Sequence, residues 1–177
     1  MTVGGNDISA MTQAGGTDGR PVAEVEAMTQ QAVADLEEAL DWLTDPVRFP
    51  SGAFVVFANP FEFTDGTGKT DACPAANLAD LEARDDPTEL ARIIIWLNEQ
   101  FMRIAVETGT DMIFMLEHFC GHGWVATGAN ADASARCYLG PGTDRWFDDS
   151  CIHPNPTGHD MIADMFMAVV EEPGSLP

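Results

Sequence analysis

The chain has 177 residues, 45% of them hydrophobic, which favours one folded domain over residues 1–177 rather than a disordered chain. Its 29 acidic and 8 basic residues give a formal charge of −21, which disfavours binding to nucleic acids and to anionic membranes. No apolar run reaches the roughly 18 residues that a membrane span requires, and the first residues lack the pattern of a signal peptide.

Strands and helices are predicted to alternate along the first half of the chain. Residues 1–4 are typical of the end of a strand. Apolar residues recur every three or four positions from about Val22 to Thr44, which predicts an amphipathic helix. Residues 53–57 form a short apolar run typical of a buried parallel strand, and a polar loop follows over about residues 59–86.

The second half of the chain repeats this alternation. A helix with a broad apolar face is predicted from Pro87 to Thr108. Residues 111–117 are expected to form another buried strand, and residues 118–152 are irregular and rich in glycine. A last helix begins at about residues 155–157, because Pro156 suits a first helical turn. The alternation predicts an α/β fold with three layers and a parallel sheet.

Several polar residues follow the carboxyl ends of the predicted strands or precede a helix: Asn6, Asn59, Glu117, Cys120 and His153. Ligands of open α/β sheets bind at this edge, outside the carboxyl ends of the strands. We therefore expect the functional groups of the chain to gather there.

Two segments at opposite ends of the chain carry a family resemblance. The first reads Gly-Gly-Asn-Asp over residues 4–7, and the second reads His-Pro-Asn-Pro-Thr-Gly-His over residues 153–159, directly after an acidic stretch. In this order they resemble the third and fifth conserved blocks of the SGNH (GDSL-type) esterase and lipase family. The resemblance covers essentially the whole chain. It implies a three-layer, flavodoxin-like fold with a parallel sheet, N-terminally truncated here, and hydrolysis of carboxylic esters without a cofactor.

The resemblance assigns catalytic roles to the second segment. His153 would be the general base that takes the serine proton and later protonates the leaving alcohol. The family pattern Asp-x-x-His would put an acid at position 150, where this chain has Ser150. Asp149 is therefore the first choice for the acid partner of His153 and Asp148 is the second. Both could instead be solvated loop acids.

The first segment would supply the oxyanion hole. Asn6 would donate its side-chain amide to the oxyanion, and Gly4 or Gly5 would let the backbone turn tightly after the strand. In the family a Gly-Asp-Ser block with the nucleophile comes earlier, and this chain begins at what would be the third block. None of the serines has such a setting (Ser9, Ser51, Ser134, Ser150 and Ser175), and only Ser9 and Ser150 lie near the other motif residues. The chain alone is therefore expected to be inactive.

The four cysteines permit three pairings. Cys73 and Cys120 follow strands that are predicted to be neighbours, which favours disulfides Cys73–Cys120 and Cys137–Cys151. Two disulfides suit a full-length protein that is secreted or periplasmic, whereas in a cytosolic protein the thiols would be free or bound to metal.

Two rival functions remain open. The chain could be a non-catalytic acidic binding module, or a zinc-dependent hydrolase that uses His118, His122 and a cysteine. The main interpretation needs no metal and no cofactor. Its expected partner is a small-molecule, lipid or carbohydrate ester, and the sheet edge at residues 1–4 could mediate self-association.

Overall fold

The structure is a computed structural model that describes residues 1–83 and 85–171. Its helices and strands follow one another along the chain as α1 (Gly5–Gly15), α2 (Val22–Thr44), β1 (Val56–Ala58), α3 (Pro87–Thr108), β2 (Asp111–Ile113), α4 (Met115–Phe119) and α5 (Pro156–Glu171). Two short 3₁₀ helices, η1 (Thr70–Ala72) and η2 (Ala76–Ala79), lie between β1 and α3. The bounds of α2 and α3 and the start of α5 confirm the predictions from apolar periodicity.

The sheet is small and parallel. β1 pairs with β2, with Phe57 opposite Met112. Thr2 forms a parallel bridge with Ala58, so the first residues run alongside β1 on the side away from β2. The chain is therefore a mixed α/β protein whose sheet is much shorter than the predicted strands.

The strand predicted over residues 111–117 is too long, because β2 ends at Ile113 beside a buried polar side chain. The amide of Asn59 is fully buried beside the end of β2. Its oxygen accepts a hydrogen bond from the backbone N–H of Leu116, and its nitrogen donates to Glu117 at 2.9 Å. These bonds fit the first turn of α4, so residues 115–117 are helical instead of extended.

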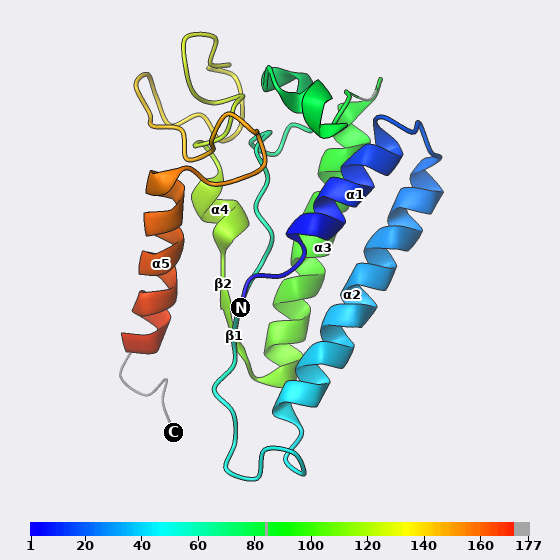
Figure 1. Cartoon of the computed structure of the whole chain (residues 1–177), viewed down its shortest axis with the longest axis vertical. Helices are drawn as coiled ribbons and strands as arrows, with labels where there is room; N and C mark the ends of the chain where they lie inside the picture. Colours follow the sequence, from blue (N-terminus) through cyan, green and yellow to red (C-terminus); the bar gives the residue numbers. More distant parts are fainter. Residues whose placement is uncertain (84, 172–177) are drawn as a thin grey trace.

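Helices pack on both faces of this sheet (Figure 1). Side chains of a strand alternate between its two faces. Phe57 accordingly packs with α1, α2 and α3, whereas Ala58 and Ile113 pack with α4, α5 and the loop between them. The chain therefore has two hydrophobic cores, one on each face of the sheet.

Helix α1 is not predicted by the sequence, because glycines stand at both of its ends. Gly4 adopts φ +88° just before it, and the carbonyl of Gly4 accepts a hydrogen bond from the N–H of Ile8. Ile8 and Met11 are buried against the neighbouring helices. Tertiary burial of one apolar face therefore stabilises a helix that its composition alone does not indicate.

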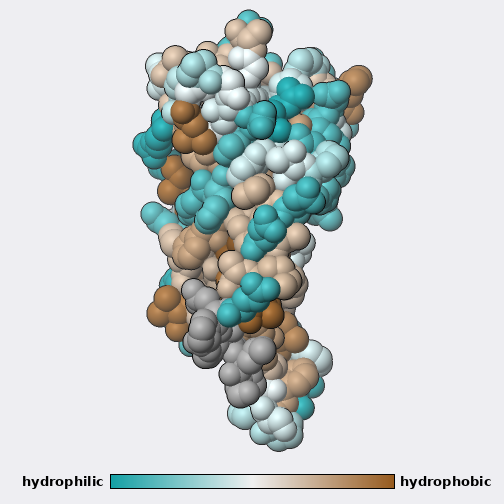
Figure 2. Space-filling model, turned by 90° about the vertical axis from the view of Figure 1, so that its left-hand side faces the viewer, coloured by the Kyte–Doolittle hydropathy of each residue, from teal (hydrophilic) through white to brown (hydrophobic). Residues whose placement is uncertain are grey.

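None of the helices within the described residues combines the length and the apolar character that a membrane crossing requires. Figure 2 shows the face that carries α5, where hydrophilic residues cover much of the upper part and hydrophobic residues are more frequent lower down. Met167 and Val170 on α5 contribute exposed apolar side chains, 51% and 39% exposed.

Candidate functional site

A cavity of about 540 Å³ joins the two sequence segments that carry the family resemblance. Its wall includes residues 4–7 at the start of α1 and His153 from the loop before α5. Residues 60–63, which follow β1, complete the same wall. The structure therefore brings Gly4, Asn6 and His153 to one cavity at the carboxyl edge of the sheet, where the sequence predicts that functional groups gather.

The cavity is lined mainly by apolar residues, together with three carboxyl side chains. Aromatic side chains line it, among them Phe61, Phe101 and Phe147. Three carboxyl side chains line it as well, from Asp7, Asp35 and Glu62, and no Lys or Arg is among its described lining residues. Its volume lies in the range of small-molecule sites. An uncharged ligand with an apolar portion suits this wall better than an anion does.

The start of α1 offers hydrogen-bond donors to the cavity. No side chain caps this helix end, so backbone N–H groups of its first turn stay available and the helix dipole is positive there. A Cβ at Gly4 would lie 3.1 Å from Cγ of Pro60, which keeps a glycine at this turn. The side chain of Asn6 is exposed and makes no hydrogen bond with the described residues. This end of α1 can therefore hold a negatively charged oxygen.

His153 sits on a tight loop that is closed at three points. Phe147 forms an antiparallel bridge with Pro154, and the N–H of Asp148 donates to the carbonyl of His153 at 2.9 Å. Cys151 has φ +77° and forms a disulfide with Cys73. The loop holds His153 exposed at the edge of the cavity.

Ser150 lies between His153 and an acid. Its Oγ is 2.8 Å from Nδ1 of His153 and 2.5 Å from Oδ1 of Asp148. The same carboxylate accepts the backbone N–H of Ser150 at 2.8 Å. The Ser150 hydroxyl lowers the pKa of Asp148 most, with its backbone N–H and the nearby His153 ring adding to the effect. Asp148 is therefore a carboxylate over most of the pH range and reaches His153 through one hydroxyl.

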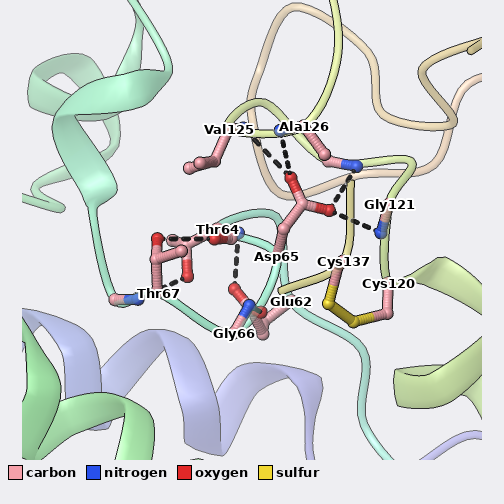
Figure 3. The surroundings of a disulfide bond; sticks show 12 residues. Glu62, Thr64, Asp65, Gly66, Thr67, Cys120, Gly121, Val125, Ala126 and Cys137 are labelled. Atoms are coloured by element: carbon pink, nitrogen blue, oxygen red, sulfur yellow. Dashed lines mark hydrogen bonds between the residues drawn. A yellow bond between two sulfur atoms is a disulfide. The ribbon is translucent and has the colours of Figure 1, made fainter. Parts of the chain in front are cut away.

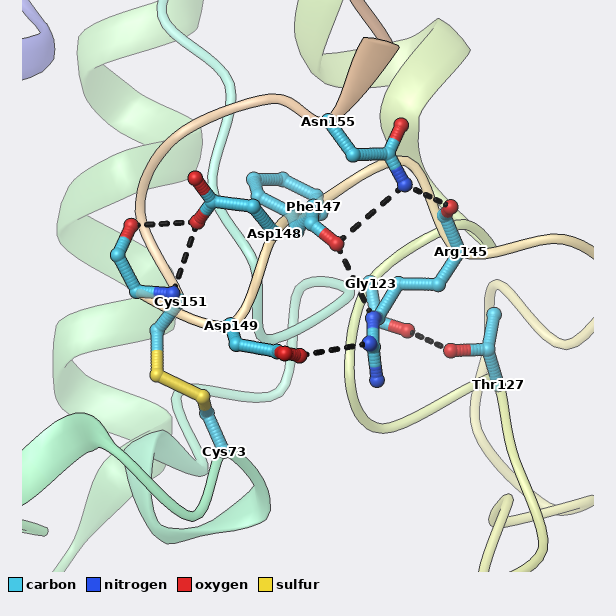
Figure 4. Close-up of polar contacts among 10 residues, drawn as sticks. Cys73, Gly123, Thr127, Arg145, Phe147, Asp148, Asp149, Cys151 and Asn155 are labelled. Carbon is cyan, nitrogen blue, oxygen red and sulfur yellow. Dashed lines mark hydrogen bonds and ion pairs between the residues drawn. A yellow bond between two sulfur atoms is a disulfide. The ribbon is translucent and has the colours of Figure 1, made fainter. Parts of the chain in front are cut away.

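Asp149, the first choice for the acid, is held elsewhere (Figure 4). Its side chain is 94% exposed and forms an ion pair with Arg145 at 3.2 Å. The guanidinium of Arg145 also stacks 3.6 Å above the ring of Trp124, and its Nε donates to the carbonyl of Phe147. Of the two nominated acids, Asp148 is the one that the structure connects to His153.

Other residues of the His153 segment shape the start of α5. Oδ1 of Asn155 accepts the N–H of Gly158, as a helix N-cap does, and Nδ2 of Asn155 donates to the carbonyl of Arg145 at 2.6 Å. A Cβ at Gly158 would collide with the carbonyl oxygen of Trp146. The motif therefore combines one imidazole at the cavity with residues that fix the helix behind it.

The disulfide pairing predicted from the sequence is wrong. The structure pairs Cys73 with Cys151 and Cys120 with Cys137, with Cα atoms 5.9 and 5.2 Å apart. The prediction assumed that cysteines after neighbouring strands lie together. Cys73 instead follows a long loop that carries it to the His153 segment, and the chain after Cys120 turns back so that Cys137 reaches it.

A buried carboxylate that the sequence analysis missed organises the loop after α4 (Figure 3). Asp65 is 1% exposed, and its two oxygens accept four backbone N–H groups at 2.8–3.0 Å, from Gly121, Gly123, Val125 and Ala126. Burial raises the pKa of Asp65, and the four donors lower it in part. A Cβ at Gly123 would lie 2.7 Å from the carboxylate oxygens of Asp65, so only glycine fits there. The Gly-x-Gly spacing at residues 121–123 is therefore the sequence signal that could have indicated this close approach.

Glu62 was also missed, and it lines the cavity three residues before Asp65. Its carboxylate accepts the N–H groups of Thr64 and Gly66 at 2.5 Å each. Burial raises the pKa of Glu62, hydrogen bonds from Thr64 and Gly66 lower it in part, and the charge of Asp65 adds to the increase. A protonated Glu62 could present a donor or acceptor to a ligand in the cavity.

The residues of the alternative zinc site have other contacts. Cys120 is in a disulfide, and Nδ1 of His118 lies 2.8 Å from the carbonyl oxygen of Phe114. The ring of His122 stacks on Trp146 with centroids 3.6 Å apart. Across residues 1–83 and 85–171, no group of three or more His, Cys, Asp or Glu side chains is placed to hold a metal ion.

Ser9 lines the cavity with Asn6 and His153, whereas Ser175 lies outside the described residues. No family model, curated protein or solved structure matches the chain. The chemistry of the cavity therefore has to be argued from the residues that line it.

Proposed function

We propose that this chain is part of an SGNH-type ester hydrolase, with His153 as the general base and Asn6 as an oxyanion donor. One observation carries the proposal. Asn6 and His153 come from opposite ends of the chain and line one cavity at the carboxyl edge of a parallel sheet. Acyl transfer needs these two kinds of group on either side of a carbonyl, a base for the nucleophile and a donor for the oxyanion.

The reaction would follow the usual two-step acyl transfer. A serine hydroxyl gives its proton to Nε2 of His153 while its oxygen attacks the ester carbonyl. The negative oxygen of the tetrahedral intermediate accepts hydrogen bonds from Asn6 and from the first turn of α1. His153 then protonates the leaving alcohol, and water repeats the sequence on the acyl-enzyme to release the acid.

We assign the nucleophile to polypeptide outside these 177 residues. No serine of the chain follows a strand in a Gly-Asp-Ser setting, and Ser150 faces Nδ1 of His153 instead of Nε2. A Gly-Asp-Ser strand added beside residues 1–3 would extend the sheet toward the three-layer, flavodoxin-like fold that the resemblance implies. The two disulfides support a secreted or periplasmic location.

The proposed substrate is an uncharged ester with an apolar acyl or alcohol group. The aromatic wall would bury that group, and the exposed carboxylates of Asp7 and Asp35 would disfavour an anionic substrate. The same charges would assist release of the carboxylate product.

The test is an assay with p-nitrophenyl acetate and butyrate, first on this chain and then on the chain completed by its upstream coding sequence. The chain alone should show no turnover above background, as should Ser9→Ala and His153→Ala, because enzymes without a working nucleophile lose about 10⁶ in turnover. In the completed protein His153→Ala should abolish hydrolysis, and Asn6→Ala should lower kcat by about 10²–10³.

Full activity of the completed protein with His153→Ala would overturn the proposal. A completed protein that binds an ester without hydrolysing it would instead support an acidic binding module. Sedimentation of the chain alone tests the predicted self-association, which the completed protein should lose if the sheet edge causes it.

A further inference from the structure

Three side chains of the loop before α5 form a chain of hydrogen bonds. The carboxylate of Asp148, the hydroxyl of Ser150 and the Nδ1 atom of His153 are linked by contacts of 2.5 and 2.8 Å. The backbone strengthens this arrangement, because Asp148 N–H donates to the carbonyl of His153 and the carboxylate of Asp148 accepts the N–H of Ser150. The disulfide at Cys151 anchors the loop between Ser150 and His153.

Counting protons decides the direction of both hydrogen bonds. A carboxylate can only accept, and a serine hydroxyl has a single proton to donate. The Ser150 proton is therefore on the contact with Asp148. On its other contact Ser150 must accept, so the proton between Ser150 and His153 belongs to Nδ1 of the imidazole.

We propose that Ser150 is a positioning residue that relays the negative charge of Asp148 to His153 and holds the imidazole as the Nδ1–H tautomer. The other nitrogen, Nε2, then keeps its lone pair and can accept a proton. The tautomer follows from the contacts alone, whereas its use in catalysis rests on the proposed ester hydrolase.

This relay replaces a direct contact between an acid and the imidazole. Ser150 stands at the position where the Asp-x-x-His pattern has its acid, and the acid of this chain lies two residues earlier, at Asp148. The hydroxyl spans the gap between them. The arrangement also argues against Ser150 as the nucleophile, because its proton is already engaged by Asp148 and its imidazole contact is with Nδ1.

The test is the ¹⁵N spectrum of the four histidine rings in the intact, disulfide-bonded chain, at a pH where the His153 ring is neutral. His153→Gln assigns the signals of His153 by their disappearance. In the wild type, Nδ1 of His153 should have the shift of a protonated ring nitrogen and Nε2 that of an unprotonated one. Ser150→Thr keeps the hydroxyl and should keep this pattern.

Two variants should change the protonation pattern of the His153 ring nitrogens. Asp148→Asn places an amide against Ser150 that can donate to the hydroxyl oxygen, so the hydroxyl proton turns toward Nδ1 and the ring proton moves to Nε2. Ser150→Ala removes the relay, and the Nδ1–H preference should be lost. Asp149→Asn is the matched control, because it changes the neighbouring acid and breaks the ion pair with Arg145 but leaves the relay intact.

The proposal fails if Asp148→Asn and Ser150→Ala both keep the wild-type shifts, or if Asp149→Asn changes them as much. These readings do not depend on turnover, so an absence of hydrolysis leaves the relay standing and a failed relay leaves the proposed hydrolase standing. In the completed enzyme, Asp148→Asn should lower kcat by up to about 10⁴-fold, the cost of a wrong tautomer, with Ser150→Thr close to wild type.

Discussion

The two sides of the sheet are held together by different means. On one side, α1, α2 and α3 form a helical half in which Val25, Leu40 and Leu97 are fully buried between neighbouring helices. Residues 59–83 and 114–171 form a loop half, in which most of the chain before α5 is irregular, and its residues 79–82 reach over the end of α1 (Figure 1). The helical half depends on repeated apolar contacts, and the loop half depends on a few specific bonds.

Those bonds join residues that are distant in the sequence. The disulfide Cys73–Cys151 spans 78 residues, and Asp65 binds a loop that begins 56 residues later, at Gly121. The rings of Phe61, Phe119 and Phe147 also pack against one another in this half. Because His153 belongs to the loop half, the geometry of the candidate site depends on these few bonds more than on helix packing.

The largest expected effect is loss of the disulfide that anchors the His153 loop. Replacing Cys73 and Cys151 together by Ser should lower the free energy of unfolding by about 4.5 kcal/mol, from the entropy of closing a loop of 78 residues. The disulfide between Cys120 and Cys137 closes a loop of only 17 residues. Replacing these two residues by Ser should therefore lower the free energy of unfolding by about 3 kcal/mol. Urea unfolding of both double variants measures the difference. Equal losses would contradict the dependence on loop length.

Asp65→Ala should be nearly as costly. It leaves four backbone N–H groups without their acceptor in a buried loop, for a loss of about 3–5 kcal/mol. Hydrogen exchange should speed up at residues 121–126 and stay slow in α2 and α3. Asp132→Ala is the control, since that carboxylate binds Ser134 at an exposed turn. Equal protection of residues 121–126 in both variants would show that Asp65 does not hold the loop.

Shortening a buried side chain in the helical half should have the opposite effect on hydrogen exchange. Leu40→Ala removes a fully buried side chain from α2 and should cost about 3 kcal/mol. Its effect on hydrogen exchange should spread over α1, α2 and α3, while residues 121–126 keep their protection. Faster exchange confined to the loop half would show that the two halves do not divide as described.

The smallest effect concerns pH. Burial raises the pKa of Glu62 above its ordinary value of 4.5, so the folded chain binds this proton more tightly than the unfolded chain does. The stability due to Glu62 is therefore fully present below pH 4.5 and is lost as pH rises toward the raised value. Glu62→Gln should flatten the decrease of Tm over that interval. A Tm profile that keeps the wild-type slope would mean that another group causes it.

The candidate site shows what local patterns can and cannot predict. The His-Pro-Asn segment and the Gly-Gly-Asn segment are each short, and their placement after a strand or before a helix predicts that Asn6 and His153 share an edge of the sheet. The choice between Asp148 and Asp149 depends on a single turn of irregular loop, in which Arg145 draws one carboxylate away and Ser150 binds the other. No spacing rule contains that information.

The amino-acid sequence by itself determined α2, α3 and α5, because apolar residues at helical spacing and a proline in a first turn act within a few residues of one another. Tertiary structure decided the formation of α1, the pairing of the cysteines and the burial of Asp65. It also decided the early end of β2, where the side chain of Asn59 binds the first turn of α4. Each of these depends on a contact between segments far apart in the chain, and such contacts form only when the two halves have packed on their shared sheet.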